Sequence, residues 1–335
     1  MDTSEPRNRS IPTVSKALGQ PLDQPPRRIA FLLVDGFALM SYSSAVEPLR
    51  AANLLNLDPL YEIHHLAVRG THAVSSSGAE IRASLTFDDV EKLDDIFVVA
   101  GGDPMSFEDA KVVRWLRKCS AQGVRLGGIS GGPVILALAG LMAGRRMTIH
   151  WEHAEALIEV APDLLIERSL YVIDRDRLTC AGGIAPLDMM HALITEQHGE
   201  KFARRVSDWF MHTDIRPSGG PQRSGLCERY GVTSVPLLIA IEAMENHIAD
   251  PLDLNQLARV ANLSKRQLQR LFDKQIGSSM MAFYRGLRLE KARNLLTQSP
   301  LSLTEIALAT GFSSSSHFSN AFHEKFGEPP SRMRA

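Results

Sequence analysis

Apolar runs and helix-spaced apolar residues alternate along the first two-thirds of this 335-residue chain. The apolar runs predict buried strands and lie at residues 29–34, 61–68, 95–102, 124–130 and 147–151. The segments between them that predict helices are residues 45–55, 107–123 and 132–142. Such an alternation indicates a parallel sheet that is covered by helices on both faces.

The pattern changes at residues 212–225, where two prolines and three glycines fall within fourteen residues. This composition predicts a linker between domains, because proline and glycine interrupt helices and strands alike. Before it, residues 170–183 predict two strands, and residues 186–199 and 201–212 predict helices. After it the periodic segments are helical, so an all-α domain is expected to follow the α/β domain.

The first 26 residues contain five prolines and few large apolar side chains, which predicts a disordered tail. We therefore divide the chain into four parts. They are a tail (1–27), an α/β domain (28–212), a linker (213–234) and an all-α domain (235–335).

The all-α domain contains two copies of one segment, residues 252–272 and 301–322. The matching apolar pairs are Leu257/Ile306, Ala258/Ala307, Leu263/Phe312, Leu268/Phe318 and Phe272/Phe322. Capping boxes open the first helix of each copy and comprise Asp253 with Gln256 and Ser302 with Glu305. Short turns follow, and Gly311 suits a left-handed position in the second. Each copy predicts a helix-turn-helix, near 254–273 and 303–326.

The second helix of each copy leaves polar residues on its outer face. Arginine can pair with guanine and glutamine with adenine in the major groove, whereas serine discriminates less between bases. We therefore predict DNA contacts by Arg266, Gln269, Arg270, Ser315, Ser316, Ser319 and Asn320. The competing interpretation is an ordinary helical bundle with a solvated outer face.

Charge favours the DNA-binding interpretation. Residues 250–335 hold 12 Lys and Arg against 7 Asp and Glu, a net charge of +5, whereas the other residues carry −6. A basic domain attached to an acidic body is suited to a polyanion such as DNA.

The sequences "RLEKARNLL", "EIALATGFSSSSHFSNAFHEKFG" and "PPSRMR" resemble the signature of the AraC family. The resemblance implies that two recognition helices enter successive major grooves on one face of the DNA. Asn320 stands where some members of the family carry arginine.

Residues 128–132, "GISGG", fit the G-x-S-x-G elbow of serine hydrolases. The surrounding sequences "FLLVDGFALM", "FVVAGGDP" and "LTCAGG" resemble the class I glutamine amidotransferase-like domain of the ThiJ/PfpI group. This resemblance implies a flavodoxin-like domain. Fused to an AraC module, it is similar to a class of regulators that includes activators of glycine betaine, carnitine and arginine catabolism.

Enzymes of this fold carry cysteine at the elbow and an acidic residue in the first βα loop. Here Ser130 and Ser41 stand at the matching places, so we expect no catalytic residue. A serine hydroxyl without a base is a poor nucleophile. The alternative is a serine hydrolase or amidase that uses Ser130. Its possible triad partners are Asp174, Asp176, Asp188, His191 and His198, and His150 and His153 follow the next predicted strand.

Without catalysis, the elbow can still bind an anion through backbone N–H groups at the start of a helix. We expect the effector to be a small carboxylate or a quaternary amine, contacted by Ser130, Gly131, Gly102 and Trp151. A cation would need aromatic faces, for which the candidates are Phe37, Tyr42, Trp151 and Trp209.

The sequence thus predicts a ligand-responsive transcriptional regulator, an activator by family resemblance. Its expected partners are promoter DNA, RNA polymerase, the effector and a second copy of the chain. We expect no cofactor, no metal ion and no membrane association. Three cysteines without metal or disulfide spacing point to the cytoplasm. A third interpretation is a chaperone-like or structural protein whose elbow has no role.

Overall fold

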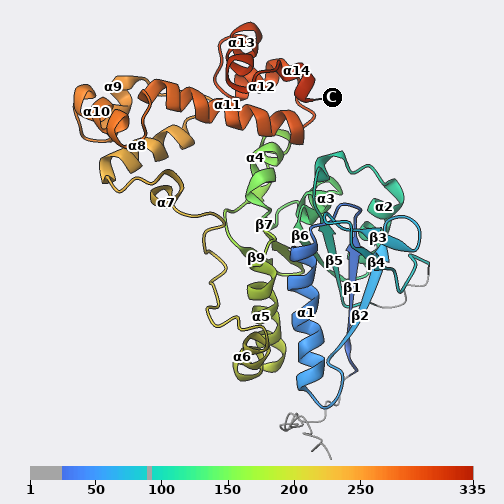
Figure 1. Cartoon of the computed structure of the whole chain (residues 1–335). Coiled ribbons are helices and arrows are strands. Elements are labelled where there is room, and N and C mark those ends of the chain that lie inside the picture. Colours follow the sequence, from blue (N-terminus) through green and yellow to red (C-terminus); the bar gives the residue numbers. More distant parts are fainter. Residues whose placement is uncertain (1–24, 89–92, 335) are drawn as a thin grey trace, which may run out of the picture.

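The computed structural model describes residues 25–88 and 93–334 (Figure 1). Most of the predicted tail, residues 1–24, therefore lies outside the described residues. Arg27 already begins the first strand. No described helix is both long and apolar enough to cross a bilayer.

A six-stranded sheet with the order β2-β1-β5-β6-β10-β9 forms the centre of the first domain. Its strands are β1 (Arg27–Leu33), β2 (Tyr61–Ala67), β5 (Asp95–Ala100), β6 (Arg125–Ser130), β9 (Tyr171–Asp174) and β10 (Arg177–Cys180). Neighbouring strands are parallel, except that the edge strand β9 runs antiparallel to β10. The predicted parallel sheet is therefore confirmed.

Among the described residues, three helices contribute to the apolar core on each face of this sheet. α1 (Leu39–Leu55), α5 (Ala185–His198) and α6 (Glu200–Trp209) bury their apolar side chains in one core. The other core contains side chains from α2 (Ala110–Ala121), α3 (Gly132–Leu138) and α4 (Trp151–Val160). Strand β5 is buried at all six positions, which explains why its sequence is continuously apolar after Asp95.

Two details of the first domain differ from the sequence prediction. The strand predicted at 147–151 shrinks to β7 (Arg146–Met147), which pairs with β8 (Leu165–Ile166) outside the main sheet. Its end is instead the start of α4, because the His150 side chain caps this helix by accepting the Glu152 N–H. The helix predicted at 132–142 ends at Leu138, shortly before Gly140 adopts a left-handed φ of 71°.

A small hairpin of β3 (His72–Val74) and β4 (Glu80–Arg82) and a short 3-10 helix η1 (Pro104–Ser106) complete the first domain.

The second domain is helical, as predicted (Figure 1). Its helices are α7 (Leu226–Tyr230), α8 (Val235–Asn246), α9 (Leu254–Val260), α10 (Lys265–Gln275), α11 (Met280–Gln298), α12 (Leu303–Ala309), α13 (Ser315–Phe326) and α14 (Pro330–Met333). The long helix α11 contributes Tyr284 to a core with α8–α10 and Leu289, Ala292 and Leu295 to a second core with α12 and α13. One helix thus joins two helix-turn-helix units.

The repeat is visible in the local geometry. Both predicted capping boxes are formed, at Asp253 and at Ser302, and Ser264 forms a third with Gln267. The turns also correspond, since Asn262 and Gly311 occupy equivalent places with φ of 54° and 71°. A Cβ atom on Gly311 would lie 2.7 Å from the carbonyl oxygen of Ile248, so the second turn leaves room only for glycine.

The proline- and glycine-rich segment after α6 is bound to the first domain. The fully buried Asp188 carboxylate accepts hydrogen bonds from Arg216 and from Nε2 of His212. Further on, Gln222 Nε2 donates to the carbonyl oxygens of Ile149 and Ser169. This segment therefore runs along the first domain as a strap before it reaches α7.

Candidate functional site

The second helices of the two repeats, α10 and α13, each bury one apolar side and expose the other. Leu268 and Phe272 face the core in α10, and Phe318 and Phe322 do so in α13. The opposite faces carry the residues predicted to contact DNA. Arg266, Arg270, Ser316 and Asn320 are exposed, and Gln269, Ser315 and Ser319 are partly exposed.

Two of these side chains already have partners. Gln269 Nε2 donates to Asp273 Oδ1 at 2.8 Å, and the Ser315 hydroxyl lies 3.1 Å from the Thr304 hydroxyl. The exposed side chains of Arg266, Arg270 and Asn320 lie on the same outer faces. At the positions predicted to contact DNA, α10 therefore presents two exposed guanidinium groups, whereas α13 presents small neutral groups.

Ser130 has the geometry of an elbow. It ends β6 with φ of 60°, a left-handed conformation that is uncommon for a residue with a Cβ. The glycines beside it are explained by packing, because a Cβ on Gly132 would lie 1.9 Å from the Val98 carbonyl oxygen and one on Gly128 would lie 2.5 Å from Pro133 N. The glycine-rich sequence thus allows α3 to pack directly on the sheet.

Ser41 lies beside the elbow, as the alignment of motifs predicted. A Cβ atom on Gly182 would be 2.8 Å from the Ser130 Cβ and 2.9 Å from the Ser41 hydroxyl. The Ser41 hydroxyl accepts the Gly183 N–H at 2.8 Å. At this position an acid could support a nucleophile, but serine offers only a neutral hydroxyl.

In the described part of the chain, no general base is hydrogen-bonded to the Ser130 hydroxyl. Among the described residues, no hydrogen bond joins the Ser130 hydroxyl to a histidine or a carboxylate. Ser130 is also only 6% exposed to solvent. Of the possible triad partners, Asp188 anchors the strap and His191 Nδ1 lies 2.8 Å from the Ser207 hydroxyl. Asp174 is engaged with Arg175 and Asp176 with Arg177. His198 stacks edgewise on Tyr61.

One expected anion donor is already occupied. The Gly131 N–H donates to the Ala100 carbonyl oxygen at 3.1 Å, which corrects the expectation that it is free. Gly102 follows β5 with φ of 60°. Trp151 begins α4 and is 39% exposed, but the Arg223 guanidinium covers its ring at 4.3 Å from the centroid.

The aromatic candidates do not form one cage. Phe37 and Tyr42 are buried in the core and pack against each other with ring centroids 5.6 Å apart. Trp209 ends α6 on the face of the sheet opposite α4. Among the described residues, Trp151 makes ring contacts with His150 and Arg223 and not with the other three candidates.

Two histidines stand where α4 begins, next to the elbow. The His150 N–H lies 3.5 Å from the Ser130 carbonyl oxygen, and His153 is one turn further along. Burial lowers the pKa of both imidazoles, and their mutual repulsion lowers the pKa of His150 further. Both rings are therefore neutral near pH 7.

Among the described residues, His150, Glu152 and His153 form a group with the spacing of metal ligands, within 4.8 Å of one another. The Nδ1 atoms are in use, since that of His150 caps α4 and that of His153 binds Gln298. Each imidazole keeps one ring nitrogen for another partner.

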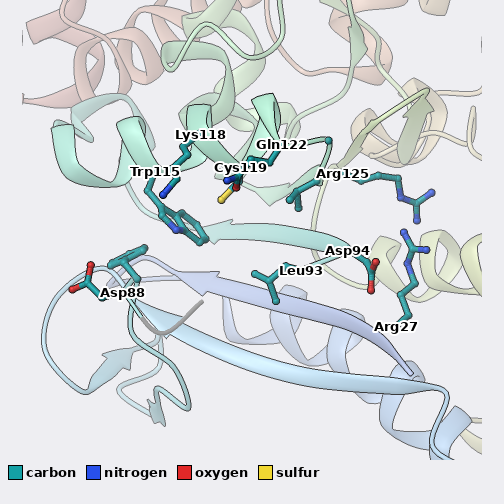
Figure 2. Close-up of a pocket in the computed structure, with 12 residues that line it drawn as sticks. Arg27, Asp88, Leu93, Asp94, Trp115, Lys118, Cys119, Gln122 and Arg125 are labelled. Carbon is teal, nitrogen blue, oxygen red and sulfur yellow. The ribbon is translucent and has the colours of Figure 1, made fainter. Parts of the chain in front are cut away.

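A cavity of about 750 Å³ opens at the other end of the sheet, beside the first residues of β1 and β6 (Figure 2). Figure 2 shows Trp115, Lys118 and Cys119 of α2 lining it. Its arginines, Arg27 and Arg125, both bind the buried Asp95 carboxylate. The single Asp95 carboxylate offsets one of these two positive charges, and the cavity is separate from the elbow.

Comparison with known proteins places both domains. The DJ-1/PfpI family matches residues 27–196, and the Helix-turn-helix domain family matches residues 257–335. The HTH-type transcriptional regulator GlxA of Rhizobium meliloti is 49% identical over 92% of this chain and 95% of its own. The chain belongs to the AraC-type transcriptional regulators with an amino-terminal DJ-1/PfpI domain.

Other relatives of this regulator agree. The HTH-type transcriptional regulators CdhR and GbdR of Pseudomonas aeruginosa are 43% and 38% identical, over 91% and 92% of the chain and 90% and 84% of their own lengths. A solved AraC family transcriptional regulator from Pseudomonas putida is 29% identical with a TM-score of 0.51, and covers 55% of this chain and 100% of its own. The protein is thus a DNA-binding transcriptional regulator, and the hydrolase alternative finds no support.

Proposed function

We propose that this regulator binds a small metabolite at the elbow and performs no chemistry there. The observation that carries the proposal is the strained, nearly buried Ser130, which keeps the elbow backbone but has no base hydrogen-bonded to it among the described residues. A hydroxyl without a base does not attack, but it can donate a hydrogen bond to a ligand.

The effector is a small carboxylate or a quaternary amine, from the catabolism of an amino acid or an amine. Its proposed contacts are Ser130, Gly131, Gly102 and Trp151, with neutral His150 at the start of α4. Since the Gly131 N–H already donates to Ala100, we assign hydrogen bonding to the Ser130 hydroxyl and the imidazole. Gly131 and Gly102 have no side chains, so the effector can approach their backbone closely.

A thermal-shift screen with glycine betaine, carnitine and arginine tests this proposal. We expect at least one compound to raise the melting temperature, and Ser130→Ala to weaken that shift. Ser313→Ala is the matched control, because Ser313 is exposed in the second helix-turn-helix. A screen in which no carboxylate changes the melting temperature would count against the elbow as the effector site.

A fluorophosphonate probe tests the absence of catalysis separately. We expect Ser130 to remain unlabelled at concentrations that label an active serine hydrolase completely. Stoichiometric labelling of Ser130 would show an activated nucleophile and overturn this part of the proposal.

On DNA, we propose that α10 and α13 enter successive major grooves. Arg266, Gln269, Arg270, Ser315, Ser316, Ser319 and Asn320 would contact bases or phosphates. We further propose that the regulator works in the cytoplasm as a homodimer and activates transcription through RNA polymerase. Binding to a duplex selected from a random pool, measured against salt concentration, tests the DNA interface.

A further inference from the structure

A helix of the DNA-binding domain packs against a helix of the first domain (Figure 1). The helices are α4 and α11, which cross where the carboxyl-terminal half of α11 passes α4. His153 Nδ1 donates to Gln298 Oε1 at 2.6 Å, and both residues are buried, at 3% and 9% exposure. A short hydrogen bond between buried side chains fixes the position of both groups.

Packing and charge extend this contact along α4. Ala156 is buried in the same apolar core as Leu289, Ala292 and Leu295 of α11. Beside it, the Lys291 ammonium lies 3.6 Å from the Glu155 carboxylate and 3.8 Å from that of Glu159. We refer to these interactions together as the α4–α11 contact.

The other end of α4 belongs to the elbow. His150, which caps the helix, has its N–H 3.5 Å from the Ser130 carbonyl oxygen. The backbone N–H of His153 follows after one turn and donates to the His150 carbonyl oxygen at 3.0 Å. The imidazole that binds Gln298 is therefore separated from the elbow by a single helical turn.

The position of α11 matters for DNA binding because this helix belongs to both helix-turn-helix units. Its first half supplies Met280 and Tyr284 to the core of the first unit, and its second half supplies Leu289 to Leu296 to that of the second. A displacement of α11 relative to the first domain therefore moves both recognition helices together.

We propose that the α4–α11 contact transmits occupancy of the elbow to the DNA-binding domain. A group held beside Ser130 displaces the first turn of α4, and the His153–Gln298 hydrogen bond passes this displacement to α11. The elbow and the DNA-binding surface are then energetically coupled. Effector binding must change the affinity for DNA by the same factor by which DNA binding changes the affinity for the effector. The proposal rests on the elbow being the effector site.

The test places a carboxylate at the elbow covalently. The Ser130→Cys variant, made in a Cys227→Ser background, is alkylated with iodoacetate, which attaches a negatively charged carboxymethyl group. Iodoacetamide attaches a neutral group of similar size and serves as the control. The native thiols Cys119 and Cys180 should react more slowly, because burial raises their pKa to about 11 and about 12 and leaves little thiolate at pH 7. Peptide mapping then separates an adduct at position 130 from any adduct at Cys119, which lines the cavity at the other end of the sheet. Mass spectrometry confirms a single adduct. If the introduced thiol is not alkylated, Ser130→Trp fills the same position and enters the same comparison.

Two readouts follow on the full-length protein. The first is hydrogen exchange in α11 without DNA, and the second is affinity for the selected duplex. We expect the carboxymethyl group to change α11 exchange and to change DNA affinity about fivefold or more. In the presence of Gln298→Ala, both changes should fall within the error of measurement. Lys291→Ala should reduce them, whereas Arg293→Ala should not, because Arg293 lies on the same helix but pairs with Glu290 inside the DNA-binding domain.

Equal responses with and without Gln298→Ala would overturn the proposal, as would a carboxymethylated protein with unchanged α11 exchange. Failure of the unmodified protein to bind any duplex would instead count against the proposed function. In that case the exchange measurement alone still decides whether the elbow and α11 are coupled.

Discussion

The two helix-turn-helix units of this regulator share a scaffold but present different surfaces. Both have a capping box, a left-handed turn residue and two large buried apolar side chains in the second helix. The first unit exposes Arg266 and Arg270, whereas the second exposes Ser316 and Asn320. The two copies of the repeat thus share the capping, turn and core residues that form the fold, and they differ in the exposed residues that we expect to contact DNA.

The difference suggests a division of labour. Long cationic side chains contribute both phosphate attraction and bidentate contacts to guanine, whereas serine and asparagine form weaker neutral contacts. The second unit is also the one that lies against α4 of the first domain, through Ala156. We expect the first unit to supply most of the affinity and the second to respond to the effector domain.

The largest expected effect comes from emptying one core at a time. Phe272→Ala and Phe322→Ala each remove a fully buried ring, at a cost of about 3–5 kcal/mol of unfolding free energy. Because the rings lie in separate cores, hydrogen exchange should increase in α9 and α10 for the first variant and in α12 and α13 for the second. Loss of protection in both units from either variant would contradict two separately packed units.

The next largest effect concerns affinity. Arg270→Ala should weaken binding to the selected duplex by about 1–3 kcal/mol and lower its salt dependence. Asn320→Ala should cost less, about 0.5–1.5 kcal/mol, because its contact is neutral. Fluorescence anisotropy at several salt concentrations measures both. A larger loss from Asn320→Ala than from Arg270→Ala would reverse the proposed division of labour.

The two turns offer a smaller test of the same comparison. Gly311→Ala should destabilise the second unit by about 1–2 kcal/mol for the left-handed conformation alone, with an added clash against Ile248. Asn262→Gly should change stability by only a few tenths of a kcal/mol, since glycine accepts the same φ. Thermal unfolding measures the stability of both variants. An equal loss of stability in the two variants would contradict the left-handed conformation that we assign to both turn residues.

The smallest expected effect is one of pH on the first domain. Burial lowers the pKa of four histidines there, His65, His150, His153 and His198. Below the usual histidine pKa of about 6.5 the unfolded chain binds protons that the folded domain does not, so stability should fall as pH decreases from 7 to 5. Hydrogen exchange of the sheet at pH 7.5 and 5.5 measures this. Unchanged protection after correction for intrinsic exchange rates would contradict it.

Much of this architecture follows from the sequence. Apolar runs predicted the sheet, and capping residues such as Asp253 and Ser302 predicted the starts of α9 and α12, because both signals are local. The elbow was also predicted, but the reason for its glycines was not. Gly132 and Gly128 are explained by the contact of α3 with the sheet, which depends on residues distant in sequence.

Helix α4 and its contact with α11 were missed. The apolar residues at 147–149 resemble a strand. The helix that follows begins where the His150 side chain accepts the Glu152 N–H, and histidine is not one of the usual capping residues. The bond between His153 and Gln298 spans 145 residues, and no local pattern marks it. The negative charges at Glu155 and Glu159, spaced for one helix face, were the available signal.

Hydroxyl-radical footprinting of the full-length regulator on its selected duplex tests the central claim most directly. The account predicts two protected segments about 10 base pairs apart on one face of the DNA, with Arg270→Ala weakening one of them and Asn320→Ala the other. A single protected segment that both variants weaken equally would contradict the binding of two successive grooves by α10 and α13.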